Sequence, residues 1–456
     1  MKPHLSEHVT LFSSIVKWTI FASVVGMLAG LGTAFFLKVL SLATGLYGQN
    51  LHFQMFLPAS LLVSSALTRF LAPDAAGHGT EKVIEAVHQR AGHISFRIVP
   101  VKLAATIITL ASGGSAGKEG PCAQIAAALA SSVASVARLP AADKKKLVIC
   151  GISAGFATVF GTEIAGALFG IEVLVLGQMM YDVLFPSFVA AIVGYHVATS
   201  LGVTYPYEAV SITAHLSGWS FVEMLLLGVW CGIIALFFIQ LLHLARKLLE
   251  RFSWHWSDRA LIGGALLVLI GTFVSRDYLG LGLSSIETAL HGGRLPLAAF
   301  FWKTVTTSIT LGCGGSGGVL TPIFFIGSSA GNLFASLFHE SNLAAFSAIG
   351  MVAVLAAAAN TPIAASVMAM EMFGSAIGPH AAVACMTSFL IVGYHSVYPS
   401  QLLGIQKSAS LSAPEGSELG VTRAKVTPRE KSLLALLLMM KSKARPARDH
   451  TKPPEN

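Results

Sequence analysis

The chain has 456 residues, of which 54% are hydrophobic and only 11% charged, and its formal net charge is +8. A soluble domain usually carries about 25% charged residues, and apolar runs of about 20 residues, long enough to cross a bilayer, recur along this chain. A signal peptide followed by a soluble enzyme is therefore excluded. Since no pattern of alternating short strands accompanies these runs, the composition predicts an all-α polytopic membrane protein.

In chain order, we expect a short cytoplasmic lead, two membrane-embedded repeats and a tail. The predicted bounds are 1–8 for the lead, 9–200 and 201–405 for the repeats, and 406–456 for the tail. The tail is basic and too short for a regulatory domain, and its stretch "EKSLLALLLMMKSK" is typical of an interfacial amphipathic helix. Basic residues in the tail, in 143–146 and in 246–251 predict a cytoplasmic location and contact with membrane lipid rather than nucleic acid.

Several apolar segments are too short, or too interrupted by Gly and Pro, to span a bilayer as plain helices. They are residues 98–111, 121–137, 322–337 and 362–373. Irregular backbone at membrane depth is tolerated only where protein shields it or where it lines a cavity. We therefore expect half-helices that end inside the membrane.

The two halves of the chain resemble each other at a nearly constant spacing. Residues 113–121 match residues 314–322, which lie 201 positions later. Residues 151–173 match residues 350–372, which lie 199 positions later. Within the second pair, Glu172 matches Glu371 and Thr162 matches Thr361. A duplicated architecture with broken helices is typical of transporters and channels, whose site lies where the repeats meet. The alternative is independent enrichment of Gly and Ala in packed membrane helices.

The stretch "SGGSAGKEGP" (112–121) lies between two apolar runs, and "GGSGGVLTP" repeats its arrangement. Glycines permit tight turns, and Pro121 and Pro322 suit the first turn of a helix. The free amides and positive dipole of such a helix start attract anions. Two of these ends aimed at one point would form an anion site without a fixed positive charge, from which the ion can also leave.

Glu119 is the unusual residue of this stretch, because ionisable side chains at membrane depth are rare and usually functional. An ionised carboxylate at an anion-attracting helix end competes with the anion, and protonation would let it swing away. The alternative is a plain N-terminal helix cap at the membrane interface. Lys118 would extend toward water and raise the local anion concentration.

These residues carry a family resemblance that covers most of residues 9–405. GKEGP (117–121) resembles the G(K/R)EGP signature of the CLC family of chloride channels and chloride/proton antiporters, and GGVLTP (317–322) is similar to its GxFxP motif. The resemblance implies a CLC-type inverted repeat of broken, tilted helices in a homodimer, with one chloride pathway in each subunit. It also implies a multi-pass protein of the cell membrane, here of the bacterial inner membrane, without a cofactor.

The resemblance assigns roles to single residues. Glu119 would be the gate, and the anion-binding residues would be His78, Gly117, Lys118, Gly120, Val319, Leu320 and Tyr398. His78, in "GHGTE", stands where the family has a serine, and its imidazole could donate one N–H to the anion. The alternatives are a histidine without a ligand role and a metal site. We predict no metal, because His78 precedes the helix that would carry Glu81, Glu85 and His88.

Two further departures bear on the transport mode. Val173 occupies the position of the antiporters' internal proton glutamate, which is the pattern of the passive channels, and Glu172 is expected to have a structural role. Leu320 replaces the phenylalanine of GxFxP. The fluoride-exporting branch has an acidic residue at the place of Val319, so this chain departs from that branch.

The sequence therefore favours a passive chloride channel gated by protonation of Glu119. The alternative is a chloride/proton antiporter, with fluoride export a weaker third reading. An enzyme is disfavoured, because no HExxH occurs, no GxSxG occurs between a strand and a helix, and neither Ser112 nor Ser115 has an evident base.

Overall fold

The structure is a computed structural model that describes residues 3–48, 53–205, 218–251, 255–338, 340, 342–422 and 426–429. The first half forms α1 (Pro3–Gly48), α2 (Leu57–Leu71), α3 (Gly79–Gln89), α4 (Ile98–Ala111), α5 (Glu119–Val136), α6 (Ala141–Phe160), α7 (Glu163–Glu172) and α8 (Tyr181–Ser200). The second half forms α9 (Gly218–Arg251), α10 (Trp256–Phe273), α11 (Leu283–Leu290), α12 (Ala299–Gly312), α13 (Leu320–Leu337), α14 (Leu343–Ala359), α15 (Pro362–Phe373), α16 (Gly378–Ile391) and the short α17 (Leu419–Thr422).

Short elements connect these helices. They are the 3₁₀ helices η1 (Phe53–Phe56), η2 (Pro73–Ala75), η3 (Arg276–Tyr278) and η4 (Ser375–Ile377), and the two-residue strands β1 (Val175–Leu176), β2 (Leu402–Leu403), β3 (Leu411–Ser412) and β4 (Thr427–Pro428). β1 pairs with β2 in parallel, and β3 pairs with β4 in the antiparallel sense. The first pair joins the chain after α7 to the chain after α16.

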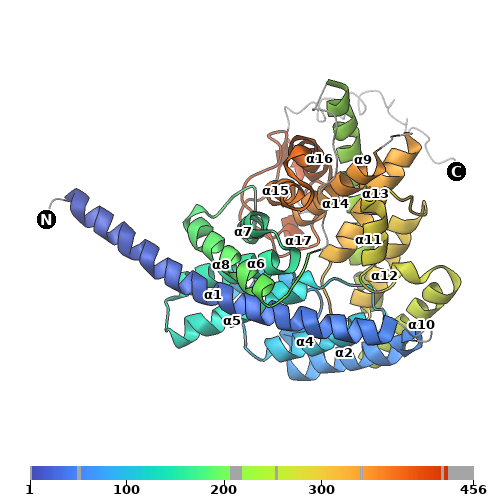
Figure 1. The fold of residues 1–456 in the computed structure, drawn as a ribbon, viewed down its shortest axis with the longest axis horizontal. Coiled ribbons are helices and arrows are strands. Elements are labelled where there is room, and N and C mark those ends of the chain that lie inside the picture. The colour runs from blue at the N-terminus through green and yellow to red at the C-terminus, as the bar shows by residue number, and fades with distance from the viewer. Residues whose placement is uncertain are drawn as a thin grey trace, which may run out of the picture.

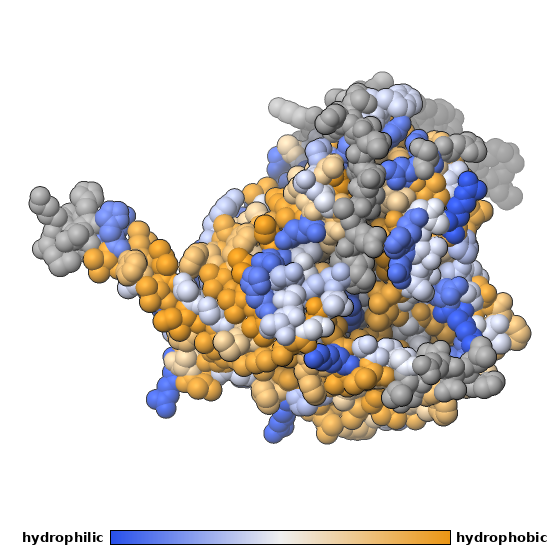
Figure 2. All heavy atoms as spheres, viewed as in Figure 1, coloured by the Kyte–Doolittle hydropathy of each residue, from blue (hydrophilic) through white to orange (hydrophobic). Residues whose placement is uncertain are grey.

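The helices form one body, from which the N-terminal part of α1 projects (Figure 1). Six helices among the described residues are long and apolar enough to cross a membrane, and the face seen in Figure 2 is largely apolar. α1 begins at Pro3 and so includes most of the lead expected at 1–8, whose cytoplasmic location stays a prediction. Most of the basic tail, including its expected amphipathic helix, lies outside the described residues. The repeat boundary at 200/201 stays a prediction.

The predicted broken helices are present. α4 and α15 have the expected bounds, whereas α5 and α13 each begin two residues earlier than expected. α13 has 18 residues and could span by length alone, yet it is mostly buried inside the body. The first turn of α13 can therefore lie next to the irregular backbone of the glycine loops inside the membrane, because the surrounding protein shields both from lipid.

The inverted repeat is visible in reciprocal contacts between α7 and α15. Glu172, at the end of α7, accepts hydrogen bonds from the amides of Ile363 and Ala364 at 3.0 and 2.7 Å. Glu371, at the end of α15, accepts them from the amides of Ile164 and Ala165 at 2.9 and 2.7 Å. Each acid thus satisfies amides that the start of the partner helix leaves without an intrahelical acceptor. Glu172 therefore has the structural role that the sequence suggested.

Reciprocal hydrogen bonds between the two repeats also hold the two glycine loops, which precede α5 and α13. Side-chain hydrogen bonds cross between the repeats at these loops, among them Thr106–Ser316 (3.1 Å), Ser115–Thr307 (3.0 Å), Ser115 N to Thr310 Oγ1 (3.0 Å) and Ser316 N to Thr109 Oγ1 (3.1 Å). Gly113 and Gly314 open these loops with φ values of +99° and +95°, a conformation that favours glycine. The loops are therefore held at fixed positions inside the protein.

Glu172→Ala should lower the free energy of unfolding by about 2 kcal/mol, because two buried amides at the start of α15 lose their acceptor. The midpoint of thermal unfolding in detergent measures the loss. Glu287→Ala, at an exposed position of α11, is the control and should leave the midpoint unchanged. Equal midpoints for the two variants would contradict the structural role of Glu172.

Candidate functional site

Two glycines bring the starts of α5 and α13 face to face. Gly117 and Gly318 form an antiparallel bridge with N–O distances of 2.7 and 2.6 Å. A Cβ on Gly318 would lie 2.7 Å from the amide nitrogen of Gly120, and one on Gly117 would lie 3.0 Å from that of Thr321. The missing side chains therefore let two helix N-termini, one from each repeat, approach the same point.

Glu119, the first residue of α5, is only 1% exposed and reaches across to the start of α13. Its carboxylate accepts a hydrogen bond from the amide of Thr321 at 3.1 Å and another from the Thr321 hydroxyl. These donors and the positive end of α13 would also hold a small anion. The carboxylate thus occupies a position that suits a transported anion.

Next to this point, several buried polar atoms have no partner among the described residues. They include His78 Nδ1, Thr80 Oγ1, Glu81 Oε2 and the Tyr398 hydroxyl. The rings of His78 and Tyr398 lie 6.1 Å apart, and Thr80 Oγ1 lies 3.6 Å from where a Cβ on Gly120 would be. Buried polar groups almost always have a hydrogen-bonding partner. A group of unsatisfied hydroxyls and a ring nitrogen therefore marks a place for a polar ligand, and hydroxyl donors suit an anion.

The loop that carries His78 is held by a buried lysine. Lys102 of α4 donates to the carbonyl oxygens of Ala75 and Gly77 at 3.0 and 2.6 Å. His78 itself has extended backbone and is the N-cap of α3, so it precedes the helix as expected. Lys102 therefore fixes the loop and places a basic group behind the ring of His78.

Tyr398 is held in a similar way. Its amide donates to Ser396 Oγ at 2.9 Å, and the amide of Val397 donates to the carbonyl of Ala358 at 2.9 Å. Nearby, Gln401 Nε2 donates to the carbonyl of Val173 at 2.7 Å. Val173 is fully buried and offers no ionisable group at the position of the family's internal glutamate.

The other residues predicted to bind the anion, Val319, Leu320 and Lys118, lie at the starts of α13 and α5. Val319 is the N-cap of α13 and Leu320 its first residue, so their backbones lie at the start of this helix and their side chains are buried. Lys118 is the half-buried N-cap of α5, and both hydrogen bonds to the Glu119 carboxylate come from Thr321 rather than from this lysine.

Two residues of the alternative metal site, Glu85 and His88, have other partners. Glu85 pairs with Lys82 at 2.8 Å and with Arg90 at 3.5 Å, and His88 Nε2 lies 3.1 Å from the carbonyl oxygen of Leu174. In the part of the chain that the structure describes, no three metal-ligating side chains converge.

Sequence reasoning missed Thr80, Lys102 and Thr321. Thr321 lies inside the GGVLTP motif, directly before the proline of the first turn of α13. This position could have identified it as a residue of the anion site. For Lys102 the signal was its match with Lys303 at the repeat spacing of 201 residues. Both lysines are fully buried and donate to backbone carbonyls. For Thr80 we find no comparable signal in the sequence.

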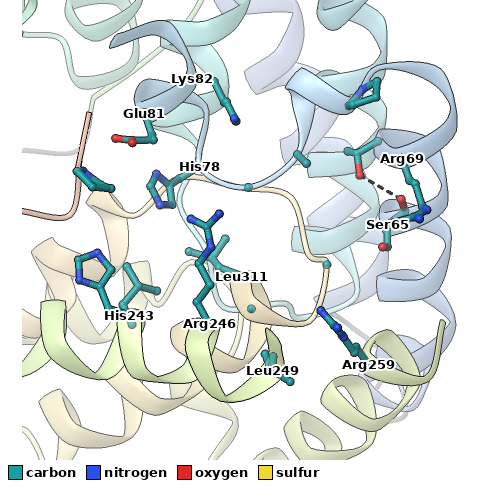
Figure 3. Close-up of a pocket in the computed structure, with 18 of the residues that line it drawn as sticks. Ser65, Arg69, His78, Glu81, Lys82, His243, Arg246, Leu249, Arg259 and Leu311 are labelled. Carbon is teal, nitrogen blue, oxygen red and sulfur yellow. Dashed lines mark hydrogen bonds between the residues drawn. The ribbon is translucent and has the colours of Figure 1, made fainter. Parts of the chain in front are cut away.

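A cavity of about 800 Å³ leads to His78 (Figure 3). Its charged and histidine lining is Arg69, His78, Glu81, Lys82, His243, Arg246 and Arg259. Arg246 and His243 of α9 extend toward His78 in this view. Since positive side chains outnumber the single carboxylate, the cavity attracts anions to the inner site. Arg246 belongs to the basic segment that the charge pattern predicts to face the cytoplasm, so we predict that the cavity opens on that side.

This fold and site define an anion-transporting membrane protein with its pathway between two inverted repeats. The profile of the voltage gated chloride channel family matches residues 59–393. The chain therefore belongs to this CLC family, and it is a multi-pass membrane protein of CLC-type anion transport.

Three similar proteins illustrate the relationship. A "Chloride/fluoride channel protein" of Pseudomonas syringae pv. tomato is 37% identical over 88% of this chain and 90% of its own length. An "H(+)/Cl(-) exchange transporter ClcA" of Vibrio cholerae is 29% identical over 76% of this chain and 80% of its own. The crystal structure of a CLC-type fluoride/proton antiporter is 28% identical, has a TM-score of 0.81, and is matched over 85% of this chain and 98% of that one.

Thr321→Val should raise anion flux at neutral pH by roughly three- to tenfold, because ionised Glu119 loses one of its two hydrogen-bond donors and leaves the site more readily. Flux from reconstituted vesicles, measured across a pH series, tests this. Thr321→Ser keeps the hydroxyl and should behave like the parent protein. If the valine variant also matches the parent, the hydroxyl has no part in holding Glu119.

Proposed function

We propose that this protein exchanges halide anions, chloride and fluoride, for protons across the bacterial inner membrane. The observation that carries the proposal is the Glu119 carboxylate, buried between two helix starts and bound by the amide and hydroxyl of Thr321. This group can carry a proton and can also take the place of an anion. Exchange requires both abilities at one position.

The exchange follows from charge balance at this point. Ionised Glu119 satisfies the donors at the start of α13, and an anion there would be repelled. When the carboxylate takes a proton it becomes neutral, and an anion then replaces it at the same donors. Return of the carboxylate expels the anion and releases the proton, so each movement of the side chain links the two fluxes.

Coupled exchange is favoured here over the passive conduction that the sequence suggested. One solved structure with a similar fold is described as a fluoride/proton antiporter, and relatives of this chain are described as proton/chloride exchangers. Passive conduction is the second candidate. It is supported by Val173, which offers no proton acceptor, and by the relative described as a channel.

Fluoride is included for a chemical reason as well. It is a small, strongly hydrated anion that needs strong hydrogen-bond donors to replace water. The hydroxyls of Thr80, Thr321 and Tyr398 add such donors to the backbone amides. Val319 stands where the fluoride branch has an acidic residue. This difference concerns the coupling of anion to proton flux as well as the choice of anion.

The homodimer, with one pathway in each subunit, and the contact of the basic segments with membrane lipid stay predictions from the family resemblance and the charge pattern. The gate role of Glu119 and the anion-binding roles of His78 and Tyr398 belong to the present proposal.

In vesicles with an imposed pH gradient, the reversal potential of the parent protein should be displaced from the Nernst value of the anion, because protons move with it. The measurement is made with chloride and with fluoride in turn. A potential that remains at the Nernst value for both anions would replace exchange by passive conduction.

Glu119→Gln and Glu119→Ala should each raise anion efflux, flatten its pH dependence and abolish proton movement, because neither side chain can be an anion or carry the proton. Efflux from vesicles and a pH-sensitive dye measure the two fluxes. Glu287→Gln is the control. A pH profile that is unchanged in both variants would remove Glu119 as the gate.

A further inference from the structure

Proton exchange needs a group that delivers protons to Glu119 from the cytoplasmic side, and Val173 is not one. Two other carboxylates in the first half of the chain already have partners. Glu172 accepts two amide hydrogen bonds from α15, and Glu85 pairs with Lys82 and Arg90. Neither has a buried oxygen without a partner.

Glu81 differs from both. It lies in the first turn of α3, directly after His78 and Thr80, and it lines the cytoplasmic cavity (Figure 3). Its Oε1 accepts from the amide of Ser400 at 3.1 Å and from the Ser400 hydroxyl at 2.5 Å. Its Oε2 is buried and has no partner among the described residues. The bonds to Ser400 orient the carboxyl group and leave Oε2 to carry a proton.

Tyr398 lies in the region between this carboxyl group and the gate. It precedes by two residues Ser400, which binds Glu81, its ring lies 6.1 Å from that of His78, and its buried hydroxyl has no hydrogen-bond partner among the described residues. Thr80, which lies close to the start of α5, has an unpartnered hydroxyl in the same region. The space between the two carboxylates is therefore lined by groups that can hold water or an anion.

We propose that Glu81 is the internal proton acceptor of this protein. A proton leaves water in the cavity and binds Oε2, which turns Glu81 into a neutral acid. It then moves past Tyr398 to the Glu119 carboxylate, and Glu81 becomes ionised again. One proton is transferred in each step, no electrons are exchanged, and the anion takes the place that the neutral Glu119 leaves.

The surroundings allow Glu81 to change its protonation state. Burial raises its pKa to about 7, against the opposing effect of the Ser400 hydrogen bonds, and α3 is not among the candidate membrane spans. Around it lie titratable and charged groups from three helices and from the α3 N-cap, namely Lys82, Glu85, His78, Lys102, His243 and Arg246. The raised pKa means that Glu81 takes up a proton at a higher pH than an exposed carboxyl group does.

This inference rests on the proposed exchange, so the test measures anion and proton flux together in vesicles containing the full chain. In Glu81→Gln, proton flux should fall by about 100-fold, and the reversal potential should move to the anion's Nernst value. Anion flux should stay within about threefold of the parent, since glutamine keeps the contact with Ser400. Glu81→Asp should restore part of the proton flux, and Glu85→Gln, one turn further along the same helix, is the matched control.

The outcomes separate the two proposals. A parent protein that moves no protons overturns the proposed exchange and this inference with it. A coupled parent with an equally coupled Glu81→Gln variant overturns the inference alone. A folded Glu81→Gln variant that loses both fluxes also overturns it, because Glu81 would then serve the structure of the anion path. Loss of proton flux alone, with recovery in Glu81→Asp, supports it.

Discussion

The structure depends on two helix starts that are buried inside a membrane protein. The first amides of α5 and α13 have no intrahelical acceptor, and no bulk water reaches them. Something negative must therefore stand at these ends. In the described state the Glu119 carboxylate stands at the start of α13, and in the proposed exchange an anion takes its place. Attraction for anions and competition by a tethered acid are two consequences of the same unsatisfied amides.

The inverted repeat supplies the frame that keeps these ends in place. Each repeat satisfies polar groups that the other leaves open, through Glu172 and Glu371 at the helix starts and through serine and threonine hydroxyls at the glycine loops. Because the two sets of contacts are equivalent, the site lies between the repeats and belongs to neither. A rigid frame of this kind confines the motion to a side chain, which suits the gate proposed for Glu119.

The frame does not determine whether the ion moves alone or with a proton. That depends on which carboxyl groups can reach Glu119 and from which side. Val173 stands where the family usually has an internal acid, while Glu81 lines the cavity that also contains His78 and has one oxygen without a partner among the described residues. Relatives with similar folds are described both as channels and as exchangers.

The sequence by itself determined the membrane class, the duplication, the bounds of α4 and α15, and the importance of the loop before Pro121. These features are local, since they follow from apolar runs, glycine spacing and one acid at membrane depth. Only the tertiary structure decided that Thr321 binds Glu119 and that Ser400 binds Glu81, contacts that join residues 202 and 319 positions apart. No periodicity encodes such partners, because they meet only when one repeat is inverted against the other.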